Sequence, residues 1–249
     1  MQRRSPTPEL LDDRAYRDLD ELRGNLRDMA RYDRWLGAFA LGLRLATAGL
    51  ARHSAYVGLD VGCGAGDFIA CARRAFPGAT WLGVDLSRDV LRVARHAHPR
   101  LPAVCAQGAS LPLADAAVDV VICIHVLHHL APPQAARLLG ECRRVARLRA
   151  VCIDLTRSPA TLLGAWLLTR LTSRNRLTRA DGVQSVRRAY TPQEAARLAQ
   201  QAGWRDVSVQ RHGPFRYSLT SGALTGTAPS APARCPAQHE DEPGRARRV

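Results

Sequence analysis

Residues 56–70 read YVGLDVGCGAGDFIA, and this stretch decides the fold of the chain. An apolar run of strand character leads into three glycines, Gly62, Gly64 and Gly66, and a helical pattern follows them. Glycine permits positive φ and a close approach of the backbone to a ligand, because no Cβ intervenes. The stretch therefore predicts a strand, a glycine turn and a helix whose free N–H groups favour an anionic group.

Short apolar runs alternate with helical patterns along the rest of the core, which is typical of a parallel sheet covered on both faces. The predicted fold class is α/β, a Rossmann-like doubly wound sheet of seven mostly parallel strands with helices on both faces. We expect strands at about 56–61, 80–85, 102–106, 118–124, 149–154 and 204–210, and a late strand pair that includes His212 and Arg216. We expect helices at about 66–75, 87–97, 133–146 and 192–202.

Three segments depart from this alternation. Residues 1–52 are predicted to form an N-terminal helical lid, with a charged, helix-prone part over 1–30 and a second helical part over 31–52. Residues 156–190 form an insertion that we expect at the carboxyl edge of the sheet, where open α/β sheets place their ligands. Residues 221–249 are rich in Ser, Thr, Ala and Pro and then charged, which predicts a disordered tail.

Composition and charge constrain the partners. The formal net charge is +14, and all 36 basic residues are arginine, spread along the chain. Such a balance is found in proteins that bind nucleic acid or anionic membranes. A lysine-free chain rich in Ala, Arg, Gly and Pro is also typical of GC-biased coding, and we prefer this interpretation. We therefore expect no nucleic-acid partner.

Targeting and cysteine patterns give further expectations. No apolar stretch reaches the roughly 18 residues of a membrane span, and the N-terminal arginines are not followed by the apolar segment of an export signal. We therefore expect a cytoplasmic protein without a membrane span. The 7 cysteines are scattered and include no C-x-x-C pair. Neither a disulfide framework nor a metal site is expected, and the oligomeric state is left open.

The residues around the glycines distinguish two ligand classes. A dinucleotide site requires a small residue at the sixth position of G-x-G-x-x-G/A, but that position is Asp67, which would oppose a pyrophosphate. Asp60, at the end of the first strand, suits the ammonium of a methionine moiety. Asp85 ends the second strand, 19 residues after Gly66, where its carboxylate can accept from both ribose hydroxyls. Capping of a helix is the alternative role of Asp85, but the combination favours S-adenosylmethionine over NAD.

The runs LPLADAAVDVV (111–121) and LHHL (127–130) complete a wider pattern with Asp60–Gly66 and Asp85. Together they resemble the class I S-adenosylmethionine-dependent methyltransferases, of the small-molecule type found in quinone biosynthesis, over residues 55 to 155. The resemblance implies a methyltransferase domain over 53–220. It implies cofactor contacts from Asp60, Gly62, Cys63, Gly64, Gly66, Asp85, Leu86, Gln107, Gly108 and Ile124.

Two positions depart from that class. An acidic residue usually faces the adenine amine before the Leu-Pro pair, and Gln107 stands there instead. A Gln amide can accept from N6 and donate to a ring nitrogen, as in adenine recognition elsewhere, so we expect binding to survive. The Pro-Gly-Gly turn before the fifth strand is replaced by Ala146-Arg147-Leu148-Arg149.

The flanks carry a narrower resemblance. The segments are DRWLG (33–37), DLTRS (154–158), SVRRAYT (185–191) and HGPFR (212–216). They resemble bacterial methyltransferases that accompany type III polyketide synthases and methylate phenolic or pyrone products. The resemblance implies a small hydrophobic aromatic acceptor, and we expect O-methylation of a phenolic polyketide or quinone-like compound.

The catalytic candidates follow the fourth predicted strand. A neutral imidazole titrates near pH ~6.5 and can deprotonate a phenol, so His128 or His125 is predicted as the base or as an acceptor-orienting group. Packing of a histidine at a helix start is the alternative. We expect Arg34 and Trp35 on a helix that covers the cofactor, and structural roles for Asp154, His212 and Arg216.

The sequence is also compatible with two other functions. One is a nucleic-acid (tRNA) methyltransferase, although Ala131-Pro132-Pro133-Gln134 offers neither the acid or amide nor the aromatic ring that base amino-methylators place after strand four. The other is a non-catalytic module that binds S-adenosylmethionine, because the glycine loop and Asp85 report binding only.

Overall fold

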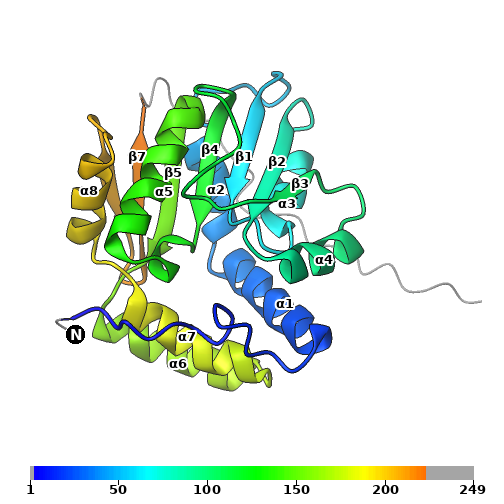
Figure 1. Cartoon of the computed structure of the whole chain (residues 1–249), viewed down its shortest axis with the longest axis vertical. Helices are drawn as coiled ribbons and strands as arrows, with labels where there is room; N and C mark the ends of the chain where they lie inside the picture. Colours follow the sequence, from blue (N-terminus) through cyan, green and yellow to red (C-terminus); the bar gives the residue numbers. More distant parts are fainter. Residues whose placement is uncertain (1–2, 223–249) are drawn as a thin grey trace, which may run out of the picture.

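A computed structural model describes residues 3–222 of the chain, so the predicted tail, apart from its first two residues, lies outside the described residues. One sheet contains the strands β1 (Val57–Val61), β2 (Thr80–Asp85), β3 (Ala103–Cys105), β4 (Val118–Ile124), β5 (Ala146–Leu155), β6 (Ser208–His212) and β7 (Arg216–Ser221). Their order is β3-β2-β1-β4-β5-β7-β6 (Figure 1). All neighbours are parallel except β7, which runs antiparallel to β5 and β6. The predicted fold class is confirmed.

Helices connect these strands. They are α1 (Leu19–Trp35), α2 (Ala38–Ala46), α3 (Asp67–Ala75), α4 (Arg88–Ala97), α5 (Pro132–Val145), α6 (Pro159–Thr172), α7 (Arg176–Arg188) and α8 (Pro192–Gln201), with a short 3₁₀ turn, η1 (Leu127–His129). Among residues 3–222, none of the helices combines the length and the apolarity needed to cross a bilayer.

Strand β4 shows why the sheet is covered on both faces. All of its residues are buried, and successive side chains of a strand point to opposite faces. Val121 and Cys123 pack with residues of α5 and α8, whereas Val120 and Ile122 pack with residues of α2 and α3. This central parallel strand is therefore apolar except for Asp119, and its carboxyl end lies between two layers of helices.

The N-terminal region differs from the prediction. Residues 3–18 are not helical but form an extended segment with one turn, which we call the strap. Its backbone is held by tertiary contacts, since the amides of Leu10 and Leu11 donate to the carboxylate of Asp181 at 2.8 and 3.1 Å. Helix α1 begins only after Asp18, whose side chain accepts from the Glu21 amide, and it continues past the boundary expected near residue 30.

The insertion folds as the helices α6 and α7. Ser158 and Asn175 cap their N-termini, accepting from the amides of Thr161 and Thr178. Figure 1 shows α1, α6, α7 and the strap together on one side of the molecule, next to the carboxyl ends of the strands. These four segments cover the edge of the sheet where the glycine turn lies.

Candidate active site

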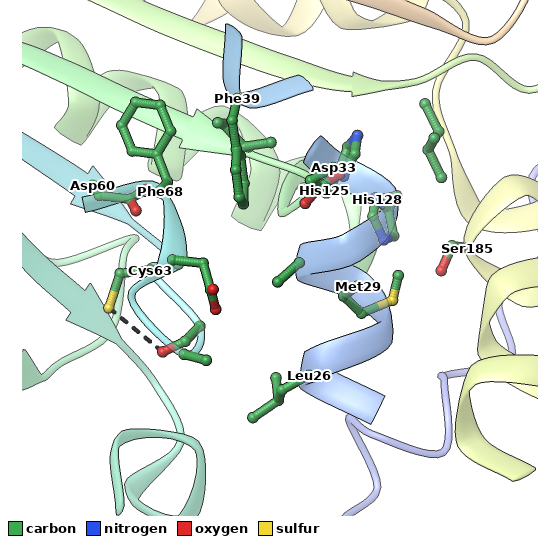
Figure 2. A pocket seen from close by; sticks show the side chains of 17 residues that line it. Leu26, Met29, Asp33, Phe39, Asp60, Cys63, Phe68, His125, His128 and Ser185 are labelled. Carbon is green, nitrogen blue, oxygen red and sulfur yellow. Dashed lines mark hydrogen bonds and ion pairs between the residues drawn. The ribbon is translucent and has the colours of Figure 1, made fainter. Parts of the chain in front are cut away.

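A cavity lies where β1 and β4 are neighbours, the point at which the strand order reverses. Ligands of open α/β sheets bind at such a switch point. The cavity is lined from three sides, by the glycine loop, by α1 and by the residues that follow β4 (Figure 2). Its volume is about 170 Å³, below the roughly 300–1,000 Å³ of ligand pockets.

The three glycines of the loop adopt the positive φ angles that glycine permits. Gly62, Gly64 and Gly66 have φ of 79°, 54° and 84°. A Cβ at Gly62 would lie 2.2 Å from Cγ2 of Val126, so this position has no room for a side chain, whereas a Cβ at Gly64 would meet nothing within 4 Å. The amides of Gly62 and Cys63 donate to the Val84 carbonyl at 2.7 and 3.0 Å. The loop is thus fixed to β2 and exposes its backbone at Gly64.

Asp60 is the most perturbed acid of the site. Its side chain lines the cavity, and the residue is only 3% exposed. Burial, with further repulsion from Asp85 and Asp33, raises the pKa of the Asp60 carboxyl to about 8. A buried carboxylate without a cation is costly, so a positively charged ligand group beside Asp60 would be strongly favoured.

Asp85 connects the two halves of the predicted cofactor site. Its carboxylate accepts from the Gly64 amide at 3.0 Å and from the Ser87 amide at 2.9 Å. The Ala106 amide donates to the Asp85 carbonyl at 3.0 Å, which brings the turn after β3 alongside. Leu86 is exposed on the same rim.

The ten predicted cofactor residues therefore lie along one edge of the sheet. Five of them line the cavity, namely Asp60, Gly62, Cys63, Gly64 and Ile124. Gly66 is the N-cap of α3. Asp85 is the last residue of β2 and Leu86 follows it, while Gln107 and Gly108 follow β3. Gly108 packs tightly, since a Cβ there would lie 2.5 Å from Cδ1 of Leu138 on α5.

His125 stands directly after β4 with φ of 55°, the left-handed region that non-glycine residues seldom adopt. This conformation turns the ring toward α1, where Nδ1 lies 3.1 Å from Oδ1 of Asp33. The opposite nitrogen, Nε2, is buried and has no hydrogen-bond partner among the described residues. His125 therefore combines a carboxylate neighbour with an unused ring nitrogen.

His128 is held differently. Its Nδ1 lies 2.7 Å from Oδ1 of Asp154, and its backbone amide donates to Oδ2 at 2.9 Å. Burial alone would raise the pKa of Asp154, but His128, with smaller contributions from His125 and the Leu155 amide, lowers the pKa below its ordinary value. Its Nε2 faces Glu9 of the strap at 3.5 Å. Asp154, expected to be structural, thus fixes the orientation of His128 directly.

The structure separates the histidines that follow β4. The rings of His128 and His129 lie 4.3 Å apart and both approach Glu9, whereas His125 approaches Asp33. The left-handed conformation of His125 and the 3₁₀ turn that follows it account for this separation. Sequence reasoning missed Glu9, and it noted Asp33 only within the DRWLG segment.

The remaining predicted residues make supporting contacts. Arg34 pairs with Asp67 and so ties α1 to the first turn of α3, while Trp35 is exposed. Arg216 donates to the Leu36 carbonyl at 2.9 Å, and Nε2 of His212 lies 2.8 Å from the Ser218 hydroxyl. These contacts of Arg34 and of the Leu36 carbonyl hold the C-terminal end of α1 over the glycine loop.

Comparison with known proteins agrees with this site. Residues 59–153 match the family model of a methyltransferase domain. The chain is 28% identical over 214 residues to a demethylmenaquinone methyltransferase of Roseiflexus castenholzii, covering 78% of this chain and 89% of that protein. It is 32% identical over 156 residues to a ubiquinone biosynthesis O-methyltransferase of Thiobacillus denitrificans, covering 58% and 62%. It is 34% identical over 177 residues to a putative 23S rRNA (guanine-N(1)-)-methyltransferase of Micromonospora griseorubida, covering 70% and 52%.

A solved structure agrees at the level of the fold. Human N-acetylserotonin methyltransferase in complex with S-adenosylmethionine has a TM-score of 0.58 and 19% identity, covering 90% of this chain and 61% of that one. The matched domain and the relatives support an S-adenosylmethionine-dependent methyltransferase, and the solved structures agree with its fold. The enzyme uses S-adenosylmethionine as its methyl donor. The open backbone at Gly64 and the buried Asp60 carboxyl fit this cofactor.

Proposed function

We propose that the enzyme methylates the hydroxyl oxygen of a small hydrophobic aromatic acceptor, a phenolic polyketide or a quinone-like compound. The relatives named for quinone methylation support this class of acceptor. The cavity wall supports it as well, because apolar side chains of α1, α2, α3 and β5 surround the site, namely Leu26, Met29, Phe39, Phe68 and Leu155. An apolar aromatic ring gains free energy when it packs against such a wall.

The cofactor assignment follows the positions of the predicted residues. Asp60 would bind the ammonium of the methionine moiety, and the loop from Gly62 to Gly66, with Cys63, would bind its carboxylate at the start of α3. Asp85 would accept from the ribose hydroxyls, since its carboxylate offers about four lone-pair sites and the structure uses two of them. The adenine would lie among Leu86, Gln107 and Gly108. Ile124, which lines the cavity, would contact the methionine moiety.

The arrangement of His125 is the observation that carries the proposed chemistry. Methyl transfer forms the O–CH₃ bond as the S–CH₃ bond breaks, and the hydroxyl proton must leave. In this proposal the proton moves to Nε2 of His125, which is unpartnered, while Asp33 stabilises the resulting imidazolium through Nδ1. His128 is the less suitable base because its Nε2 faces the strap carboxylate of Glu9.

Variants of the two histidines test the chemistry. His125→Ala is expected to lower kcat by about 10²–10⁴-fold, the usual contribution of a general base, while calorimetric binding of S-adenosylhomocysteine stays within about two-fold. Asp33→Asn should lower kcat less and shift the acid limb of the pH–rate profile. If His125→Ala keeps full kcat and His128→Ala abolishes it, the assignment of the base is wrong.

A second candidate function is methylation of RNA. The net charge of +14 favours it, as does the relative named for rRNA methylation. Incubation with radiolabelled S-adenosylmethionine discriminates between the two. We expect label in alkylresorcinols or hydroxyquinones and none in tRNA or rRNA. Labelled RNA with unlabelled phenols would overturn the proposed acceptor.

A further inference from the structure

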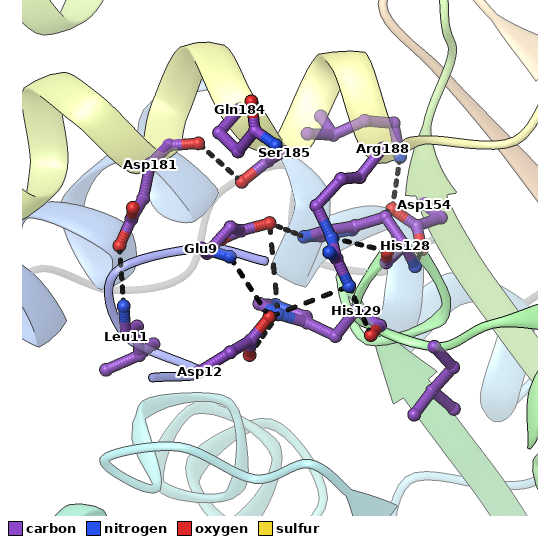
Figure 3. Close-up of polar contacts among 12 residues, drawn as sticks. Glu9, Leu11, Asp12, His128, His129, Asp154, Asp181, Gln184, Ser185 and Arg188 are labelled. Carbon is purple, nitrogen blue, oxygen red and sulfur yellow. Dashed lines mark hydrogen bonds and ion pairs between the residues drawn. The ribbon is translucent and has the colours of Figure 1, made fainter. Parts of the chain in front are cut away.

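The side chain of Glu9, a residue of the strap, lies between η1 and α7 and faces two imidazole rings (Figure 3). The residue is 3% exposed. Its Oε1 lies 3.5 Å from Nε2 of His128 and 3.8 Å from Nδ1 of His129, and it has no hydrogen-bond partner among the described residues. A carboxylate oxygen buried without a partner costs free energy. The position therefore favours a cation that the three side chains could share.

Each of the two rings also contacts a second carboxylate, on the far nitrogen of His128 and on the Glu9-facing nitrogen of His129. Asp154 holds Nδ1 of His128, so the other nitrogen of that ring points its lone pair at the strap. This is the carboxylate–histidine arrangement that orients metal ligands in proteins. Nδ1 of His129 lies 2.8 Å from Oδ1 of Asp12, a contact that an ion bound to His129 would replace.

The spacing suits an ion better than direct hydrogen bonds. Hydrogen bonds between nitrogen and oxygen span about 2.7–3.2 Å, and both contacts of Glu9 are longer. Ligands held about 2.0–2.2 Å from a tetrahedral ion lie roughly 3.3–3.6 Å apart. One oxygen and two nitrogens, all within 4.8 Å of one another, need only small shifts to reach that geometry.

The nearby arginines do not neutralise Glu9. Arg4 donates to the carbonyls of His128 and Leu130, and Arg188 donates to the carbonyls of His128 and His129. Their guanidinium groups therefore hold the backbone of η1 and leave the Oε1 atom of Glu9 without a donor.

We propose that Glu9, His128 and His129 form a site for a divalent transition-metal ion of the zinc class, which fastens the strap to η1. Two imidazoles and a carboxylate are ligands that Zn²⁺ accepts. The scattered cysteines gave no sign of this site, because none of its ligands is a cysteine. The inference does not depend on the identity of the acceptor or on His125.

Metal titration of the full chain tests the site. After treatment with a chelator, calorimetry should show one Zn²⁺ per chain, and Co²⁺ should give the visible absorption of a tetrahedral site. Glu9→Gln and His129→Asn should each weaken Zn²⁺ binding by at least about 100-fold, whereas the exposed His96→Asn should change it less than two-fold. Zn²⁺ should raise the Tm of the wild type and leave that of Glu9→Gln unchanged.

Binding of S-adenosylhomocysteine by each variant verifies that it is folded. The proposal is overturned if the wild type binds neither Zn²⁺ nor Co²⁺, or if both variants bind them as the wild type does. It is also overturned if Mg²⁺ binds and Zn²⁺ does not. A direct Glu9–imidazolium ion pair without metal would give the first of these results. No acceptor is needed in these measurements, so failure of the proposed function leaves them interpretable.

Discussion

The carboxylate of Asp85 accepts a hydrogen bond from the amide of Gly64 at 3.0 Å, across the gap between the end of β2 and the glycine loop. Its other oxygen accepts from the Ser87 amide at 2.9 Å. Asp85 thus fixes the open part of the loop relative to the start of α4. The residue proposed to bind the ribose therefore also holds the loop proposed to bind the methionine moiety, so its loss should affect both parts of the proposed cofactor site.

Asp85→Asn should weaken binding of S-adenosylhomocysteine by about 10–100-fold. A hydrogen bond to a charged group contributes about 1.5–3 kcal/mol, and an amide provides only one acceptor oxygen in place of two. Calorimetry measures the effect. Asp115→Asn is the matched control, because the Asp115 side chain is 81% exposed and pairs with Arg144 on the surface. Equal affinity of the wild type and Asp85→Asn would contradict the assignment.

The glycines of the loop should respond differently to alanine. Gly62→Ala adds a Cβ 2.2 Å from Val126 at a φ of +79°, and we expect a loss of about 2–4 kcal/mol in the free energy of unfolding from overpacking and left-handed strain. Gly64→Ala meets no atom within 4 Å, so it should lose about 1–2 kcal/mol only.

The ligand distinguishes the two variants further. The methyl group of Gly64→Ala would enter the space that the cofactor is proposed to fill, so the affinity for S-adenosylhomocysteine should fall by more than about ten-fold although the protein is folded. Denaturant unfolding and calorimetry give both quantities. A Gly64→Ala protein with wild-type affinity would show that the cofactor does not approach this backbone.

Asp60 should give the protein an unusual pH dependence. Its pKa is about 8 in the folded protein against an ordinary 3.8, so the folded state binds this proton more tightly than the unfolded state. The associated stability is complete below pH ~4 and is lost as the pH rises through 8, by up to ~1.4 kcal/mol per pH unit. Asp60→Asn removes this loss.

The free energy of unfolding of the wild type and Asp60→Asn should therefore diverge between pH 5 and pH 8, with the variant increasingly the more stable. Urea unfolding at four pH values, without cofactor, measures the difference. The same variant should bind S-adenosylhomocysteine more weakly, because the neutral amide no longer attracts the ammonium. Parallel curves for the two proteins would show that Asp60 ionises at an ordinary pKa.

Strands of the central sheet could be predicted closely because burial on both faces makes them continuous apolar runs. The observed β2 and β4 have the predicted bounds. The late strand was placed too early, at 204–210 instead of 208–212. Trp204 explains the difference, since its indole N–H donates to the Leu139 carbonyl of α5 at 2.9 Å and holds this segment beneath the helix.

The glycine loop could be predicted because its chemistry is local in sequence, whereas the partners of the histidines could not. Asp33 reaches His125 from α1, and Glu9 reaches His128 from the strap. Nothing in the spacing of these residues indicates that they meet. The strap itself was mistaken for helix because residues 3–18 are charged and leucine-containing, while the contacts that extend it come from α7.

Asp181 on α7 should control whether the strap stays closed. Its two carboxylate oxygens accept from the amides of Leu10 and Leu11, and no other side chain of the described residues holds these two amides. Asp181→Ala should therefore increase the rate of tryptic cleavage after Arg14 and Arg17, which are exposed within the strap, because opening becomes less costly. A rise of about ten-fold corresponds to ~1.4 kcal/mol.

Asp20→Ala is the control, since Asp20 is exposed and its one ion pair among residues 3–222 is with Arg23, one helical turn further along α1. Cleavage of the rest of the chain should keep its wild-type rate in Asp181→Ala, because the sheet does not depend on the strap. If the strap is cleaved no faster than in the wild type, contacts at Ser5 and Arg4 hold it without Asp181. If all sites become faster together, the variant has lost global stability and the strap does not open independently.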